Sequence, residues 1–210
     1  MKLEIIDIYK DESYVPTEPI LLPEAKAWCL VDFTDDDALI TSLIPRARKT
    51  IEKYCHISIT PRTISLTAKY CPPNYGDAQA YNYRWDAQFY GWPSPQPNDW
   101  MELPYGPVAS VQSVTRIDPN GTVTILNQNS DYFLSGVSFK NIRFNSWADQ
   151  LLIIYFTPYY MPDELKEAIL AEIAFGYKNR GAGVNRYANQ NVGVSERAQA
   201  LAAPFVRRWL

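Results

Sequence analysis

The sequence has few of the residues that usually reveal a chemical activity. It contains three cysteines, Cys29, Cys55 and Cys71, and a single histidine, His56, among its 210 residues. The cysteines are odd in number and match no metal-binding or redox spacing, so we expect three reduced thiols in a protein made in a cytosol. The sequence therefore predicts no metal ion and no cofactor.

Long apolar runs are also missing. None approaches the roughly 20 residues that span a bilayer, and we predict no membrane partner. The first residues, Met1–Tyr9, carry Glu4 and Asp7 within their apolar stretch, which is not expected of a secretory signal. The glycines of Gly181-Ala182-Gly183 follow a predicted helix and lack an adjacent Lys-Ser or Lys-Thr pair, so they form no phosphate-binding loop.

One residue pair fits catalysis, namely Cys55 and His56. A thiol beside an imidazole is typical of a nucleophile with its base, but no further ligand or orienting residue stands at a usable spacing. A lone histidine near a helix end is far more often structural. We predict no catalytic residue and no enzymatic activity, and a hydrolase around Cys55 and His56 stays open as an alternative.

The composition is that of a folded protein. Hydrophobic residues make up 47% and charged residues 20%, which is typical of globular domains. The length suits one domain with appendages. The net charge of −3 hides an asymmetry: residues 1–40 hold ten acids and three lysines, whereas residues 178–210 hold six bases and Glu196 as the only acid. Oppositely charged ends suit head-to-tail contacts between copies, although solvation of two surfaces explains them as well.

Apolar periodicity predicts the helices. One short helix is expected from Pro23 to about Asp32, and a second after Thr34, which could cap it. Its apolar face carries Ile40, Ile44, Ala47, Ile51 and Tyr54, and Pro45 should kink or split it near Thr41. Arg46, Lys49 and Lys53 fall largely on another face. A third helix is expected after Met161, with apolar residues on two sides, and a last one after Ser195 as its N-cap.

Several short segments predict strands of one small sheet. They are Thr63–Lys69, Val108–Ile117, Thr122–Leu126, Tyr132–Leu134, Asn141–Phe144 and Leu151–Phe156. Asp118-Pro119-Asn120-Gly121 suits a type I turn and thus a hairpin. The predicted fold class is α+β and mainly helical: a helical bundle with a small antiparallel β-sheet or hairpin region and a C-terminal helical tail. The predicted divisions are an arm at 1–20, a core at 21–181, and a linker with a helix at 182–210.

An aromatic-rich segment interrupts these strands. Residues 72–100 carry eight aromatic residues and five prolines, which favours an ordered loop over disorder. The segment either folds onto its own sheet or forms a contact surface, since aromatic residues are enriched in interface cores. A carbohydrate- or host-surface-binding module that uses Trp85, Trp92 and Trp100 for stacking is the main alternative function. The residues predicted at a subunit or tail interface are Tyr83, Trp85, Phe89, Tyr90, Trp92, Trp100, Arg46, Lys49 and Lys53.

Five strings of residues, in this order, resemble the head–tail connector (adaptor) family of tailed bacteriophages. They are Glu18–Lys26 continuing to Leu30–Asp32, Asp37–Ile40 followed by Ala47–Tyr54, Leu103–Val114, Pro162–Leu170 reaching Tyr177–Arg180 and, more weakly, Ala200–Phe205. Two features depart from the family. Thr157-Pro158-Tyr159-Tyr160 stands where a Gly-Tyr pair is frequent, and the aromatic segment 72–100 is longer than expected.

The resemblance implies a structural virion protein of the neck, assembled in the host bacterial cytoplasm. The expected assembly is a closed ring of about twelve copies beneath the portal protein. The ring would also bind the downstream tail or head-closure protein, and double-stranded DNA would pass through its lumen with transient, non-specific contacts. Arg and Trp are enriched among interface anchors, so we predict portal contacts near the C-terminus, unless the last helix packs on its own core. The predicted residues are Arg197, Phe205, Arg207, Arg208, Trp209 and Leu210.

Overall fold

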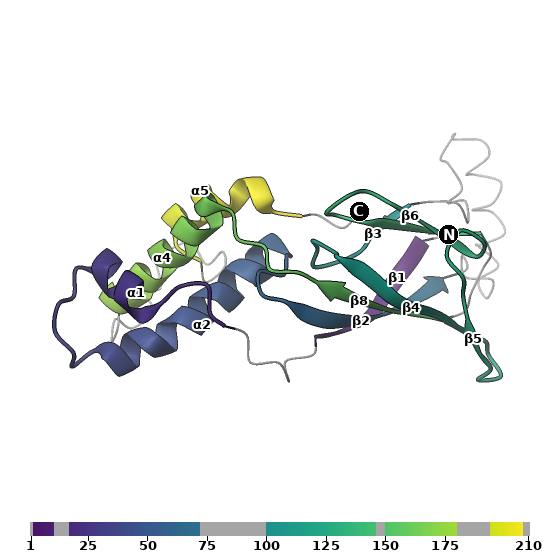
Figure 1. Cartoon of the computed structure of the whole chain (residues 1–210), viewed down its shortest axis with the longest axis horizontal. Helices are drawn as coiled ribbons and strands as arrows, with labels where there is room; N and C mark the ends of the chain where they lie inside the picture. The colour runs from purple at the N-terminus through teal and green to yellow at the C-terminus, as the bar shows by residue number, and fades with distance from the viewer. Residues whose placement is uncertain (1, 11–16, 72–99, 146–149, 180–193, 208–210) are drawn as a thin grey trace, which may run out of the picture. The chain divides into compact units, whose positions relative to one another are not determined.

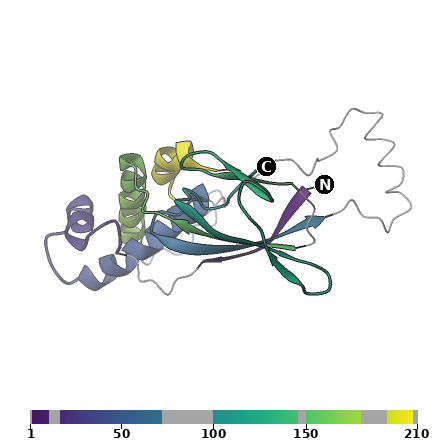
Figure 2. The ribbon, with the colours of Figure 1, turned by 45° about the vertical axis from the view of Figure 1, so that its right-hand side comes forward.

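The computed structural model describes residues 2–10, 17–71, 100–145, 150–179 and 194–207. They belong to two compact units (Figures 1 and 2). The sheet unit is formed by residues 1–14 and 62–157, and the helical unit by residues 15–61 and 158–210. Each unit thus combines two stretches of chain that lie far apart in the sequence.

The sheet unit contains two antiparallel sheets. The larger one has the strand order β1-β2-β8-β4-β5, and the smaller one has the order β3-β7-β6. The sequence predicted a single small sheet, and this prediction is wrong because Tyr132–Leu134 and Asn141–Phe144 pair with each other and not with Leu151–Phe156. The strands are β1 (Lys2–Lys10), β2 (Arg62–Cys71), β3 (Met101–Glu102), β4 (Ser110–Ile117), β5 (Val123–Ile125), β6 (Tyr132–Ser135), β7 (Asn141–Phe144) and β8 (Gln150–Thr157).

Strand alternation builds the core of the sheet unit. In β8 the side chains of Leu151, Ile153 and Tyr155 are buried and alternate with less buried neighbours, as the period of two in a strand requires. Ile64 and Leu66 of β2 are also fully buried. At the centre, the Tyr155 hydroxyl donates a hydrogen bond of 2.5 Å to the Pro104 carbonyl. Burial raises the pKa of this phenol well above its usual value.

The hairpin between β4 and β5 forms at the predicted turn. The Gly121 N–H donates to the Asp118 carbonyl across 2.8 Å, which closes a four-residue turn. Gly121 has a φ of 79°, a left-handed conformation that glycine adopts without a steric penalty. The predicted extended arm at the N-terminus contains β1, which pairs with β2 at the edge of the larger sheet.

The helical unit consists, in its described residues, of four α-helices and a short 3₁₀ turn. They are α1 (Leu22–Cys29), α2 (Asp37–Cys55), α4 (Asp163–Lys178), α5 (Glu196–Ala202) and η1 (Ala203–Phe205). Helix α4 contacts α1, α2 and α5, and Gly176 lets it approach α2 closely. A Cβ at this position would lie 3.2 Å from the Leu43 side chain. No helix of the described residues is long and apolar enough to cross a membrane.

The helix predictions are confirmed in position and corrected in detail. Ile40, Ile44, Ala47 and Ile51 form the buried face of α2. Of the two outcomes predicted for Pro45, a kink or a split near Thr41, the split is wrong, because α2 continues through Pro45 and keeps this apolar face in contact with its neighbours. The predicted cap is also wrong, since Asp36 occupies the N-cap position of α2, and its side chain makes no capping hydrogen bond to the helix backbone.

The ends of the last two helices agree better with the sequence. Pro162 precedes α4 as its N-cap, and Asp163 and Glu164 stand in the first turn, where acidic side chains stabilise the helix dipole. Ser195 caps α5 as predicted, accepting from the Ala198 N–H. Over the whole description, strands are about as extensive as helices, so the fold class is α+β and the prediction of a mainly helical protein is corrected.

Candidate functional site

The predicted interface residues fall partly outside the described chain. Of the aromatic set, only Trp100 is described, and it is 46% exposed. The guanidinium of Arg143 lies over its ring, at 5.1 Å from the centroid. The predicted residues outside the described ranges are Tyr83, Trp85, Phe89, Tyr90, Trp92, Arg208, Trp209 and Leu210.

The outward face of α2 is a basic stripe. The exposed residues of this helix are Ala38, Thr41, Ser42, Arg46, Lys49 and Lys53, with no carboxylate among them. Arg46 lies about one helical turn before Lys49, and Lys53 about one turn after it, which places all three on the same face. We call these six residues the α2 stripe. The prediction that Arg46, Lys49 and Lys53 lie on another face than the apolar residues is confirmed.

The opposite face of α2 holds a buried ion network that the sequence analysis missed. Arg48 is 3% exposed, and its guanidinium donates to Glu18 at 2.8 and 3.0 Å and to Glu52 at 2.9 Å. Burial by itself would lower the pKa of Arg48, but the hydrogen bonds and charges of Glu18 and Glu52 outweigh it and raise that pKa. The other oxygen of Glu52 accepts from the backbone N–H groups of Ile59 and Thr60.

This network fixes three pieces of chain to one another. Glu18 precedes α1, Arg48 and Glu52 lie one turn apart in α2, and residues 59–60 follow α2. A buried charge is tolerated when it is paired and its remaining hydrogen-bonding groups are satisfied. The network therefore serves the fold of the helical unit, and the spacing of Arg48 and Glu52 by four residues was the only signal for it in the sequence.

An apolar ledge projects at the turn between α1 and α2. Trp28 is 36% exposed, Leu30 92% and Phe33 47%, and we call these three residues the α1–α2 ledge. The guanidinium of Arg197, from α5, lies 5.6 Å from the Trp28 ring centroid. Large apolar side chains gathered at an exposed turn are typical of interaction sites.

Leu30 has an unusual backbone for its type. It ends α1 in the left-handed conformation, with φ 57° and ψ 45°, and its N–H donates to the carbonyls of Lys26 and Ala27. Glycine is the common residue at such a position, and a side chain there costs about 1 kcal/mol. The Leu30 side chain offsets none of this cost inside the protomer, because it is almost fully exposed.

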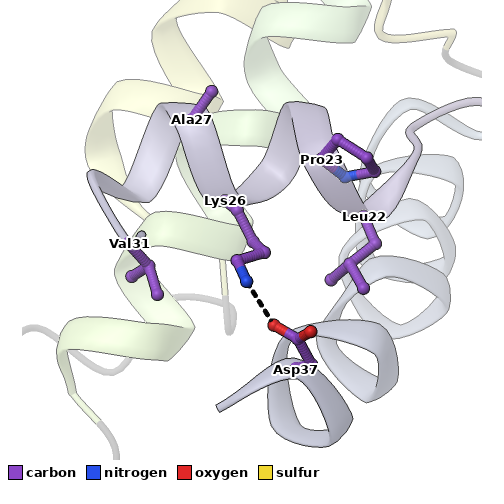
Figure 3. A pocket seen from close by; sticks show the side chains of 6 residues that line it. All are labelled: Leu22, Pro23, Lys26, Ala27, Val31 and Asp37. Atoms are coloured by element: carbon purple, nitrogen blue, oxygen red, sulfur yellow. Dashed lines mark hydrogen bonds and ion pairs between the residues drawn. The ribbon is translucent and has the colours of Figure 1, made fainter. Parts of the chain in front are cut away.

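A shallow hollow lies beside this ledge (Figure 3). Its volume is about 410 Å³, and Leu22, Pro23, Lys26, Ala27, Val31 and Asp37 line it. The Lys26 ammonium donates to the Asp37 carboxylate at 2.6 Å, with Val31 on one side of the pair and Leu22 on the other. The pair links α1 to the start of α2 and leaves an open, mostly apolar surface rather than an enclosed pocket.

The arrangement around Cys55 gives no support to nucleophilic chemistry. Cys55 is fully buried, and its sulfur lies 3.6 Å from the Ala202 carbonyl. Burial raises the pKa of this thiol from 9.0 to about 12, so the reactive thiolate is scarcely formed near neutral pH. His56 ends α2 in a left-handed conformation. Among the described residues, no group of three or more His, Cys, Asp or Glu could hold a metal ion.

The C-terminal residues pack on the helical unit as far as they are described. Ala198 and Ala202 of α5 are fully buried, and the Arg207 N–H donates to the Cys55 carbonyl at 2.9 Å. The Ser195 N–H also donates to Glu172 of α4. Arg197 is exposed, whereas Phe205 and Arg207 are half-buried. Helix α5 thus belongs to the core of this unit, and its outer side chains are what remain for a partner.

Comparisons with known proteins support one family. Residues 19–81 match the model of the phage gp6-like head-tail connector protein family, a family of structural proteins and not of enzymes. This stretch holds α1, α2 and β2, including both the ledge and the stripe. No curated protein matches the sequence.

Solved structures share the fold over the whole chain. One similar chain comes from the neck of an empty GTA particle computed with C6 symmetry, with a TM-score of 0.60, 17% identity, and coverage of 100% of this chain and 98% of that one. A chain from the virion of a native gene transfer agent (GTA) particle has a TM-score of 0.61, 17% identity and the same coverage.

A third chain comes from the neck of a native GTA particle computed with C12 symmetry. It has a TM-score of 0.54 and 18% identity, over 94% of this chain and 98% of that one. The resemblance predicted from the sequence is confirmed: this chain resembles the phage gp6-like head-tail connector proteins in sequence over residues 19–81, and chains of gene transfer agent particles in fold over nearly its whole length.

Proposed function

We propose that this chain is a structural virion protein of the neck, a head–tail connector (adaptor) that joins the DNA-filled head to the tail. The proposed assembly is a closed ring of about twelve copies beneath the portal protein, which also binds the downstream tail or head-closure protein. The match of residues 19–81 to the connector family carries this proposal. The symmetric neck particles whose chains share the fold support the ring.

The charge of the chain is compatible with a DNA channel. Strong net basicity would hold phosphates tightly and slow the passage of DNA, whereas the net charge here is −3. Contacts with the passing double helix are accordingly proposed to be transient and non-specific. Assembly is proposed to take place in the host bacterial cytoplasm, before the tail is attached.

Portal binding is proposed for side chains at the outer side of the C-terminal segment. The proposed residues are Arg197, Phe205, Arg207, Arg208, Trp209 and Leu210. Deleting the whole segment 182–210 would be a poor test, because α5 contributes the buried Ala198 and Ala202 to the helical unit. Its removal would expose apolar surface of α4 and unfold the unit for reasons unrelated to the portal.

The first experiment is native mass spectrometry of the purified chain, alone and mixed with the portal protein of the same genome. A ring that forms alone or on the portal supports the connector function. A strict monomer that does not bind the portal contradicts this function and favours the carbohydrate-binding alternative. That alternative would be established by glycan binding that is lost when Trp85, Trp92 and Trp100 are substituted by alanine.

The portal contact itself is tested with point variants. Substituting Arg197, Arg208 and Trp209 by alanine should leave the circular dichroism spectrum unchanged and weaken portal binding. The control is Lys178→Ala, which removes an exposed base of the same unit outside the proposed contact. Equal portal binding by both variants would remove this segment from the proposal while leaving the ring intact.

A further inference from the structure

The α1–α2 ledge is flanked by acidic residues. Asp32 and Asp35 lie in the same turn as Leu30 and Phe33, and both are exposed. Neither has a hydrogen bond or ion pair within the described part of the chain. Their neighbours differ: Asp37 pairs with Lys26, and Asp36 accepts from the Tyr177 hydroxyl at 2.5 Å. The ledge is therefore an apolar surface with two available negative charges.

The α2 stripe is the complementary surface on the same protein. It carries Arg46, Lys49 and Lys53 without an exposed carboxylate. The aliphatic stems of such side chains cover apolar surface while their charged ends stay solvated, so the stripe offers both contact area for Leu30 and positive charge for Asp32 and Asp35. Arg46 and Lys53 have no side-chain partner among the residues that the structure describes.

The two surfaces lie at different places along α2. The acidic ledge precedes its first residue, Asp37, and the cations occupy its second half, up to Lys53. At a rise of 1.5 Å per residue, the 16 steps from Asp37 to Lys53 span about 24 Å. One protomer cannot bring its own ledge onto its own stripe along a continuous helix, so the stripe that could complement a ledge is that of another molecule.

We propose that the ledge of one copy docks on the α2 stripe of the next copy. Leu30, Phe33 and Trp28 lie on the aliphatic stems of the stripe, and Asp32 and Asp35 pair with Arg46 and Lys53. Such a contact joins two different surfaces, so it is head-to-tail and closes into a ring when the rotation between copies allows it. This inference rests on the proposed ring and names the surfaces that would form it.

The unusual backbone of Leu30 supports this occupant. The Leu30 backbone caps α1, but its side chain is 92% exposed and gains no burial inside the protomer to offset the left-handed conformation. Burial against a neighbour would provide the missing stabilisation. DNA is not a suitable partner for the ledge, because Asp32 and Asp35 repel phosphates. Binding of DNA to the cations of the stripe would leave the exposure of Leu30 unexplained.

Charge reversal tests the contact. The ledge variant carries Asp32→Lys and Asp35→Lys, and the stripe variant carries Arg46→Glu and Lys53→Glu. Each variant alone places like charges across the proposed interface and should raise the concentration needed for ring formation by about tenfold or more. An equal mixture of the two should assemble like the wild type, because alternating copies again place opposite charges together. A chain with all four substitutions should assemble as well.

These outcomes separate the interface from the proposed function. A wild-type ring together with variants that assemble normally, or a mixture that is not rescued, overturns the interface and leaves the connector function standing. A wild type that stays monomeric both alone and with the portal overturns both. If the stripe variant forms normal rings but loses binding to a DNA duplex in a gel-shift assay, the stripe is a DNA contact and the proposal is wrong.

A second variant removes the dependence on charge. Leu30→Gly should raise the melting temperature of the monomer, because glycine adopts the left-handed conformation readily, and it should weaken ring formation by about tenfold. Asn129→Gly, at another exposed left-handed position, with φ 69°, is the matched control and should leave assembly unchanged. A Leu30→Gly chain that is stabilised and assembles like the wild type would show that Leu30 contacts no neighbour.

Discussion

The two faces of α2 place the same residue type in opposite environments. Arg46 and Arg48 are two positions apart, yet Arg46 is exposed on the stripe and Arg48 is buried among the carboxylates of Glu18 and Glu52. The buried guanidinium is held by three hydrogen bonds, and the network that it forms with Glu18 and Glu52 connects three stretches of chain. The exposed one has no such role in the protomer. Position on the helix, rather than charge, decides which arginine serves folding and which is available to a partner.

The largest expected effect comes from breaking the buried face. Arg48→Ala leaves Glu18 and Glu52 without their cation, and loss of one partner of a buried pair costs about 3–5 kcal/mol. Arg46→Ala should change the free energy of unfolding by less than about 0.5 kcal/mol. Urea unfolding followed by the helical circular dichroism signal measures both. Equal stabilities of the two variants would mean that the network contributes nothing to the fold.

A subtler change tests the carboxylate that links α2 to residues 59–60. In Glu52→Gln, only one side-chain oxygen remains to accept hydrogen bonds, from either Arg48 or the Ile59 N–H. The NH2 group that replaces the other oxygen faces a donor and cannot accept from it. We expect a loss of about 1–3 kcal/mol in the free energy of unfolding. The control is Glu24→Gln, which weakens the exposed pair with Lys166 and should cost less than Glu52→Gln, because solvent screens an exposed ion pair. A reversed order would show that exposure does not govern the strength of these pairs.

The sheet unit allows the comparison to be extended to an uncharged buried contact. Tyr155→Phe removes the hydroxyl that donates to the Pro104 carbonyl and leaves the ring packing unchanged. We expect a loss of about 1 kcal/mol, less than for either charged site, because no ion is left uncompensated. Thermal unfolding of the variant beside the wild type provides the measurement, and a loss larger than that of Arg48→Ala would contradict the ranking.

The smallest perturbation is chemical labelling of the Cys55 thiol, on the buried face of α2, in the unsubstituted protein. Cys55 should resist alkylation by iodoacetamide at pH 8 in the native protein, while the half-buried Cys29 reacts first. Peptide mass mapping after a timed reaction distinguishes the two sites, with urea-unfolded protein as the control. Rapid labelling of native Cys55 would mean that the contact between α2 and α5 opens readily.

The same thiol gives a pH dependence with a definite sign. Because the pKa of Cys55 is raised from 9.0 to about 12 in the folded state, the folded protein binds more protons than the unfolded chain between these values. This contribution to stability is intact below pH 9 and is lost as the pH rises toward 12. Replacing Cys55 by alanine should remove this part of the loss of stability at alkaline pH, as measured by the free energy of unfolding.

Much of this protein could be predicted from local patterns in its sequence. The apolar spacing of Ile40, Ile44, Ala47 and Ile51 located the buried face of α2, and the bases of the stripe were correctly assigned to another face. The turn at Asp118–Gly121 and the Ser195 cap were predicted from residue preferences alone. Such features depend on neighbours within a few residues, so the sequence contains nearly all the information about them.

Only the tertiary structure decided the rest. The division into two sheets depends on which strands meet, and alternation looks the same in either sheet. Arg48 fell outside the sequence-based candidates because its partner Glu18 lies 30 residues away, and no local pattern shows that the chain returns there. The exposure of Leu30 likewise follows from how α1 ends and α2 turns back. Periodicity is a local property of the chain, whereas buried charges and exposed apolar surfaces are decided by which distant segments pack together.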